Sequence, residues 1–217
     1  MLNKSQQTGI TFIELVISLA IALFVISGII ALFTTSVIHN RKTIEFAHLN
    51  KVLIMALNTL SKDIHRAGYW GQADTSNSNP FMVTGSTDIT INAANNCILF
   101  TYDTDNNGSL PSISSSIDDE RYGYRLQSSA IQSRPAGADF SCAAPSTAWT
   151  DLTNPNTITI TQFTIALNSG TVDIDGTGPT LTVRSVTVTI SAELTTDPSL
   201  STTLSKEIKV YNDKYNP

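Results

Sequence analysis

Apolar and polar residues follow three different patterns along this chain. From Leu15 to Phe33 the sequence holds no charged residue. After Phe33, apolar residues recur every three or four positions, which is the spacing of one helix face; they are Leu49, Leu53, Ala56, Leu60, Ile64 and Ala67. From residue 72 onward this periodicity is nearly absent, and short alternating runs rich in β-branched residues take its place. The pattern predicts a long N-terminal helix followed by a β-rich domain.

The uncharged run predicts a helix that spans a membrane. Its nineteen residues, at about 1.5 Å per residue, approach the roughly 30 Å of a bilayer core. A buried helix of a globular domain would rarely be apolar on every face over this length. A secretory signal would end near the small residues Ala20 and Ala22, yet the apolar run continues for eleven positions beyond them. We therefore expect a membrane-spanning and assembly helix at residues 10–34.

The amphipathic stretch that follows predicts a continuation of the same helix over residues 35–67, packed by its apolar face on a domain. Gly68 is the expected end, since glycine readily adopts the left-handed conformation that terminates helices. Lys62, His65 and Arg66 lie in the last turn, where positive charge is favourable. The prediction is a nearly continuous helix of about 55 residues.

Five runs in the remainder predict β-strands; they are residues 97–103, 121–127, 157–167, 180–194 and 204–212. Short polar turns between successive runs favour an antiparallel sheet. One face of this sheet requires cover, and the apolar face of the helix is the obvious candidate. The expected fold class is α+β, with a long N-terminal helix packed on an antiparallel β-sheet domain at residues 68–217.

A single carboxylate, Glu14, stands near the start of the apolar run. An ionised side chain at membrane depth costs roughly 2.5 kcal/mol or more, so such an acid is expected to have a partner or a function. Flanking charge does not fix the orientation of the helix, because Lys4 and the amino terminus balance Arg41 and Lys42.

The residues around Glu14 resemble a known signal. A short polar leader ending in Gly9, followed by "ITFIEL" and an apolar stretch, is similar to the prepilin signal of type IV pilins and pseudopilins. The resemblance implies that a prepilin peptidase removes residues 1–9 and N-methylates Ile10. It also places Glu14 fifth in the mature chain, where it would pair with the N-terminal amine of a neighbouring subunit. Many relatives begin with Phe where this chain has Ile10.

The stretch "LSKDIHRAGYWG" at residues 60–71 resembles the helix end of the PilW branch of minor pilins. In many relatives a cysteine follows the last glycine, whereas this chain has Gln72. The resemblance implies a non-catalytic minor pilin in the priming or tip complex of a type IV pilus. Its partners would be other minor pilins, the major pilin, the prepilin peptidase, the inner-membrane assembly platform and the lipid bilayer.

The implied location is the inner membrane, with a single pass, a periplasmic C-terminal domain and later incorporation into the pilus. Adhesion, twitching motility and DNA uptake are outputs that the sequence does not separate. Two alternatives stay open: a pseudopilin of a type II secretion system, and a membrane-tethered periplasmic module that binds calcium or another ligand. An anchored enzyme that uses the acids Asp118, Asp119 and Glu120 is a third.

The two cysteines, Cys97 and Cys142, lie outside any CxxC or Cys/His cluster, so nothing indicates a metal or redox motif. In an oxidising compartment we expect them to pair, closing a loop of about 45 residues and stabilising the fold by roughly 3 to 4 kcal/mol. Two free buried thiols are the alternative, because sequence does not give the distance between them.

One loop has the spacing of a calcium site. "DTDNNG" places Asp103, Asp105 and Asn107 at the first, third and fifth positions of such a loop, with glycine sixth. The twelfth position is Ser114 instead of the usual Glu, so a further ligand would come from Asp118, Asp119 or Glu120. The alternative is an ordinary turn between strands, because Asx-Gly sequences favour turns.

Charge and histidine positions exclude other classes of function. Residues 1–67 hold six basic and three acidic residues, so the remainder must sum to −8 to give the formal charge of −5, and we expect no direct nucleic-acid binding. His39, His48 and His65 all fall on the predicted helix, without an i, i+4 pair for a metal. No catalytic triad or phosphate-binding glycine loop is evident, so we expect neither an enzyme nor a cofactor apart from calcium.

Overall fold

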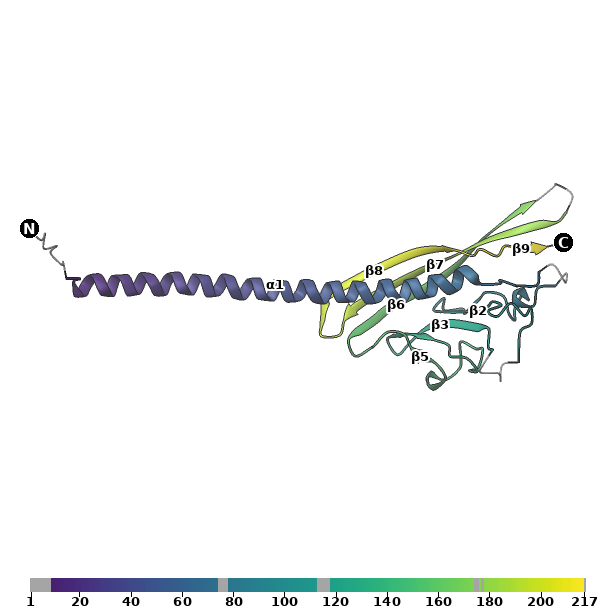
Figure 1. The fold of residues 1–217 in the computed structure, drawn as a ribbon, viewed down its shortest axis with the longest axis horizontal. Coiled ribbons are helices and arrows are strands. Elements are labelled where there is room, and N and C mark those ends of the chain that lie inside the picture. Colours follow the sequence, from purple (N-terminus) through teal and green to yellow (C-terminus); the bar gives the residue numbers. More distant parts are fainter. Residues whose placement is uncertain (1–8, 74–77, 113–117, 174–175, 177, 217) are drawn as a thin grey trace, which may run out of the picture. The chain divides into compact units, whose positions relative to one another are not determined.

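The computed structural model describes residues 9–73, 78–112, 118–173, 176 and 178–216. The chain divides into two compact units, Met1–Glu45 and Phe46–Pro217. The first unit contains the beginning of α1 (Phe12–Arg66), and the second contains the rest of this 55-residue helix and all of the strands (Figure 1).

The part of α1 that belongs to the second unit buries the predicted apolar face. Leu49, Leu53, Leu60 and Ile64 are fully enclosed, and Ala56 is nearly so. The helix ends at Arg66, and Gly68 follows with φ of 74°, the left-handed conformation expected there. This φ strains residues that carry a Cβ atom, so glycine is favoured at the helix exit.

The first sheet has five antiparallel strands in the order β1-β2-β3-β4-β5. The strands are β1 (Thr90–Ile91), β2 (Cys97–Thr101), β3 (Arg121–Gln127), β4 (Ala130–Ser133) and β5 (Thr150–Asp151). Two short 3₁₀ helices, η1 (Pro80–Met82) and η2 (Ser146–Ala148), accompany the strands; η1 precedes β1 and η2 lies between β4 and β5. Each strand pairs with the next strand in the sequence, although long loops separate β2 from β3 and β4 from β5.

The second sheet is built from three long strands and one short one. β6 (Ile158–Asp173), β7 (Thr180–Leu194) and β8 (Asp197–Lys209) pair in that order, and β9 (Lys214–Asn216) pairs with the beginning of β7. Alternate residues of β7 from Arg184 to Leu194 are buried, so one face of this sheet points into the domain. Figure 1 shows β6, β7 and β8 beside the second half of α1.

One hydrophobic core joins the helix to both sheets. Leu53 and Leu60 of α1 belong to the same buried cluster as Phe100 and Ile131 of the first sheet and Val188 of the second. The helix is also held by polar contacts, because Asp63 accepts hydrogen bonds from the hydroxyls of Tyr102 and Tyr124. The α+β fold class is therefore confirmed.

Several details differ from the sequence predictions. The strands form two sheets instead of the single expected sheet, because alternation identifies strands without saying which of them pair. The strands at 121–127 and 180–194 have the predicted bounds. β2 ends at Thr101, short of the predicted residue 103. Beyond this point the backbone forms hydrogen bonds with the residues that follow α1: Gly68 N donates to Thr101 O, and Asp103 N donates to Tyr69 O.

The long strands of the second sheet extend beyond their apolar runs. β6 continues to Asp173, where the predicted run ended at residue 167, and β8 begins at Asp197 and ends at Lys209, where the prediction was residues 204–212. Most of the added residues are exposed and polar, so little apolar alternation marks them. They pair with β7, and in β8 Leu200 also packs against the core and Thr202 donates to Asn50 of α1.

Candidate functional site

The N-terminal motif lies in an exposed, non-helical segment and the first turn of α1. Gly9, Ile10 and Thr11 precede the helix, and Ile10 is 75% exposed. The Glu14 backbone N–H donates to Thr11 Oγ1 at 3.4 Å, and Thr11 Oγ1 donates to Glu14 Oε2 at 3.5 Å. This arrangement is similar to a capping box, in which a Thr and a Glu three residues later satisfy free groups of the first turn. Residues 1–8 of the predicted leader lie outside the described residues.

The first half of α1 exposes its large apolar side chains in every direction; they include Phe12, Leu15, Ile17, Leu19, Ile21, Phe24, Ile26, Ile30 and Phe33. The helix is long and apolar enough to cross a membrane, and such a helix anchors a protein in a bilayer.

Four hydroxyl side chains in this apolar stretch form hydrogen bonds within the helix itself. The hydroxyls of Ser18, Ser27, Thr34 and Thr35 donate to helix carbonyls three or four residues earlier, at 2.7 to 3.0 Å. Such hydroxyls can lie in lipid without another partner. Glu14 differs, because its carboxylate has only the hydroxyl of Thr11 as a hydrogen-bond donor in the described part of the first unit.

The structure joins Cys97 and Cys142 in a disulfide, with 6.0 Å between their Cα atoms. Cys97 lies on β2, so the bond attaches the loop after β4 to the first sheet. The Arg125 guanidinium stacks over the Trp149 ring at 4.4 Å and donates to Cys142 O and Ala144 O. Burial lowers the pKa of Arg125.

The calcium-type loop closes at the point where β2 ends and β3 begins. Asp103 follows β2 by two residues, and Glu120 immediately precedes β3. One carboxylate oxygen from each of Asp103, Asp105 and Glu120 lies within 4.8 Å of the other two. Asp103 and Glu120 are buried, whereas Asp105 is exposed. We call these three residues the carboxylate cluster.

Asn107, the third predicted ligand, is used within the loop. Its amide nitrogen donates to Asp105 Oδ2 at 2.6 Å, and its Oδ1 accepts from Ser109 N at 2.7 Å. Ser114 lies outside the described residues. Glu120 was one of three acids that the sequence offered as an additional ligand, and it is the one that joins the carboxylate cluster.

Backbone donors hold one oxygen of each buried acid. Asp103 Oδ2 accepts from Gly71 N at 2.9 Å and from Gly108 N at 3.0 Å. Glu120 Oε1 accepts from Thr104 N. The second oxygens, Asp103 Oδ1 and Glu120 Oε2, are buried and have no hydrogen-bond partner among the described residues. A buried acceptor without a partner is costly, so these two oxygens require an explanation.

The electrostatics agree with this geometry. Burial, opposed by the Thr104 N–H and aided by the negative charges of Asp103 and Asp105, raises the pKa of Glu120 to about 7. Without a cation, the carboxyl is therefore divided between its neutral and charged forms near neutral pH.

The helix exit supports the loop. Trp70 Nε1 donates to Gly108 O at 3.1 Å, and the Tyr69 hydroxyl donates to Asn106 Oδ1 at 3.0 Å. A Cβ atom at Gly71 would lie 2.9 Å from the Asn106 backbone, so glycine permits the close approach of the two segments. The stretch at the helix end thus positions the carboxylate cluster.

The acids at 118–120 do not form a single site. Asp118 is exposed. The side chain of Asp119 is buried and paired with Arg134 at 2.7 Å and Arg121 at 3.3 Å. Of the three, only Glu120 faces Asp103 and Asp105. Three consecutive acids therefore have three different environments.

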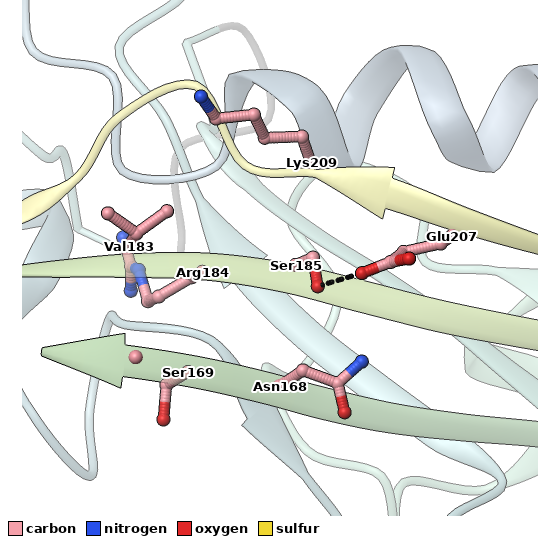
Figure 2. A pocket seen from close by; sticks show the side chains of 8 residues that line it. Asn168, Ser169, Val183, Arg184, Ser185, Glu207 and Lys209 are labelled. Atoms are coloured by element: carbon pink, nitrogen blue, oxygen red, sulfur yellow. Dashed lines mark hydrogen bonds between the residues drawn. The ribbon is translucent and has the colours of Figure 1, made fainter.

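A groove lies on the second sheet and is lined by residues of β6, β7 and β8 (Figure 2). Ser185 donates to Glu207 across it at 2.6 Å. The Arg184 guanidinium forms an ion pair with Asp88 and donates a hydrogen bond to Asn212 O. The Ser185–Glu207 hydrogen bond is therefore a contact between side chains of the paired strands β7 and β8.

The model of the family described as prepilin peptidase-dependent protein B matches residues 42–210. No curated protein and no solved structure matches the chain. The matched range begins beyond the apolar half of α1, so the match is independent of Gly9, Ile10 and Glu14.

Proposed function

This chain belongs to the prepilin peptidase-dependent protein B family, and from that membership we propose that it is a minor pilin of the PilW type. Its role concerns a pilus or a pseudopilus, and α1 anchors it in a membrane. The finer proposal is that it joins other minor pilins and the major pilin in the priming or tip complex of a type IV pilus. Its β-domain would lie in the periplasm.

The observation that supports this proposal is that the Glu14 carboxylate has only the Thr11 hydroxyl, and no cation, as a partner in the described part of the first unit. Glu14 is an acid at the start of a helix whose apolar side chains are exposed on every side, and the hydroxyls of the same stretch are already satisfied. A carboxylate in an apolar environment is tolerated best beside a cation. The N-terminal amine of a neighbouring subunit, at Ile10 after cleavage, would supply that cation when helices pack side by side.

The capping contacts offer a competing explanation for Glu14, and two substitutions separate the two roles. Glu14→Gln keeps the capping geometry, because Gln also serves at this position, but it removes the charge. Glu14→Ala removes both. If the charge pairs with a neighbouring amine, both variants should insert in the membrane, form the Cys97–Cys142 disulfide and yet lose roughly ten-fold or more of their incorporation into the filament, as the loss of a charge pair in an apolar setting implies.

The measurement is the amount of the protein in the sheared pilus fraction and in detergent-solubilised complexes with other pilins. Glu45→Gln is the matched control, because Glu45 lies on the same helix and pairs with Arg41 of its own chain at 2.8 Å. Incorporation of Glu14→Gln at the wild-type level would contradict charge pairing.

We also propose that the protein is not an enzyme. His65, in the last turn of α1, stacks on Tyr211 with 4.5 Å between the ring centroids, and its Nδ1 lies 2.6 Å from Lys209 O. These contacts give it a packing role at the helix end.

A further inference from the structure

We propose that Asp103, Asp105 and Glu120 bind one calcium ion that joins the two ends of the β2–β3 loop. This role is independent of the assembly role proposed above. The sequence indicated a calcium loop with Asp103, Asp105 and Asn107 as ligands and a further ligand from Asp118, Asp119 or Glu120. In the structure, Glu120 is the acid of these three that lies beside Asp103 and Asp105.

The donors of the carboxylate cluster have the chemistry that calcium prefers. All three side chains offer carboxylate oxygens within 4.8 Å of one another, which is close enough for a single ion to contact all of them. Hard oxygen donors select calcium or magnesium over softer metals. Calcium tolerates irregular coordination by six to eight oxygens, whereas magnesium requires a near-ideal octahedron. A site shared by two strand ends and a loop fits calcium better.

Two oxygens of the cluster are buried and free. Asp103 is fully buried and Glu120 is 2% exposed, and each has one oxygen without a hydrogen-bond partner among the described residues. The opposite oxygen of each carboxylate is fixed by backbone N–H groups, from Gly71 and Gly108 for Asp103 and from Thr104 for Glu120. Hydrogen bonds to one oxygen fix the orientation of each carboxylate and leave the other oxygen able to coordinate an ion, as in metal sites.

The cluster also concentrates negative charge. In the described part of the second unit, the arginine and lysine side chains that form ion pairs do so with Asp88 and Asp119, and none of these pairs involves the carboxylate cluster. Up to three negative charges would therefore face one another. A cation bound among the three carboxylates would neutralise this charge. Asp105 is exposed, so an ion can enter from solvent and keep water ligands on that side.

The test is thermal unfolding of the full chain in detergent, with its disulfide formed, in chelator and then in calcium chloride. A ligand that binds only the folded state at one hundred times its dissociation constant should raise the Tm by about 5 to 10 °C for a chain of this size. Isothermal titration calorimetry should show one calcium per chain.

Two variants and a control identify the ligands. Asp105→Asn and Glu120→Gln should each abolish most of the calcium-dependent rise in Tm. In chelator Glu120→Gln should be at least as stable as the wild type, because it removes a buried acid beside two others. Asp118→Asn, which changes an exposed acid two residues from Glu120, should retain the full rise.

Three outcomes would overturn the proposal. The absence of a calcium-dependent rise in the wild type would show that the carboxylate cluster does not bind calcium. An undiminished rise in both variants would place the ion elsewhere. An equal rise with magnesium chloride at the same concentration would refute the selectivity for calcium.

Discussion

At the scale of single residues, several buried charges in the β-domain have a dedicated opposite charge. Asp88 is the clearest example, because it accepts from Arg184 at 2.5 Å and from Lys214 at 2.9 Å and so connects the segment before β1 to β7 and β9. Burial by itself would raise the pKa of Asp88, but the hydrogen bond from Lys214 and the charge of Arg184 outweigh it and hold the pKa below its ordinary value.

A group whose pKa is lowered by folding stabilises the protein above its unfolded pKa and loses that effect as the pH falls. Asp88→Asn should therefore lower the free energy of unfolding by about 2 to 4 kcal/mol at neutral pH, since it leaves Arg184 buried without its carboxylate. The difference from the wild type should shrink below about pH 4.

Urea unfolding at a series of pH values measures this effect. Asp139→Asn is the control, because Asp139 is an acid of the same domain that lies nearer the surface and outside the ion pairs of Asp88. A destabilisation of equal size at every pH would show that Asp88 acts through shape and not through its charge.

At the scale of elements, the disulfide attaches a long irregular segment to the first sheet. Residues 134–149 contain no strand and only the short helix η2. They are held by Cys142, by the stacking of Arg125 on Trp149 and by a small apolar cluster of Cys97, Leu99, Ala144 and Trp149. The side chain of Leu99 faces this cluster while Phe100 faces the main core, so both sides of β2 are covered.

Removal of the disulfide should therefore destabilise the domain without removing its core. For a sequence separation of 45 residues, the loss of loop-closure entropy in the unfolded chain predicts a decrease of about 3 to 4 kcal/mol in the free energy of unfolding. The double variant Cys97→Ser, Cys142→Ser avoids a lone thiol, and denaturant unfolding measures its stability. Wild-type protein under reducing conditions should show the same loss. A double variant as stable as the oxidised wild type would contradict this explanation.

At the scale of the whole molecule, the two units bury apolar surface in different ways. The strands and the second half of α1 form a hydrophobic core, whereas the apolar side chains of the first half of the helix are exposed. Membership in a prepilin peptidase-dependent family fits this division, because a membrane or a bundle of like helices would cover the first half.

Processing at the N-terminus is a property of the whole precursor and can be measured directly. We expect the intact mass of the protein from its native membrane to correspond to a chain that begins with N-methylated Ile10, and only where the prepilin peptidase is present. Gly9→Val should prevent cleavage. A Cβ atom at Gly9 would meet no atom within 4 Å, so the variant tests the signal and not the fold.

Gly28→Val is the matched control, because a Cβ atom at Gly28 would likewise meet no atom within 4 Å; this variant should be cleaved normally. Retention of Met1 in the wild type despite the peptidase would contradict the prepilin assignment and favour a tethered binding module.

The sequence by itself determined the features that depend on local periodicity. The uncharged run, the buried face from Leu49 to Ala67, the end of the helix near Gly68 and the extent of β3 and β7 all follow from spacing and from intrinsic conformational preference. Strands of two residues, such as β1 and β5, could not be predicted, because pairing with a neighbour is the reason they are extended.

Only the tertiary structure decided which side chains meet. Asp119 and Glu120 are adjacent acids with the same local signal, yet Asp119 pairs with Arg134 and Glu120 lies beside Asp103. The division into two sheets and the contact of Trp70 with the calcium-type loop likewise depend on segments far apart in sequence. Local preference acts over a few residues, whereas a site is formed by packing across the whole domain, so the sequence indicated the loop and the fold selected which acids meet there.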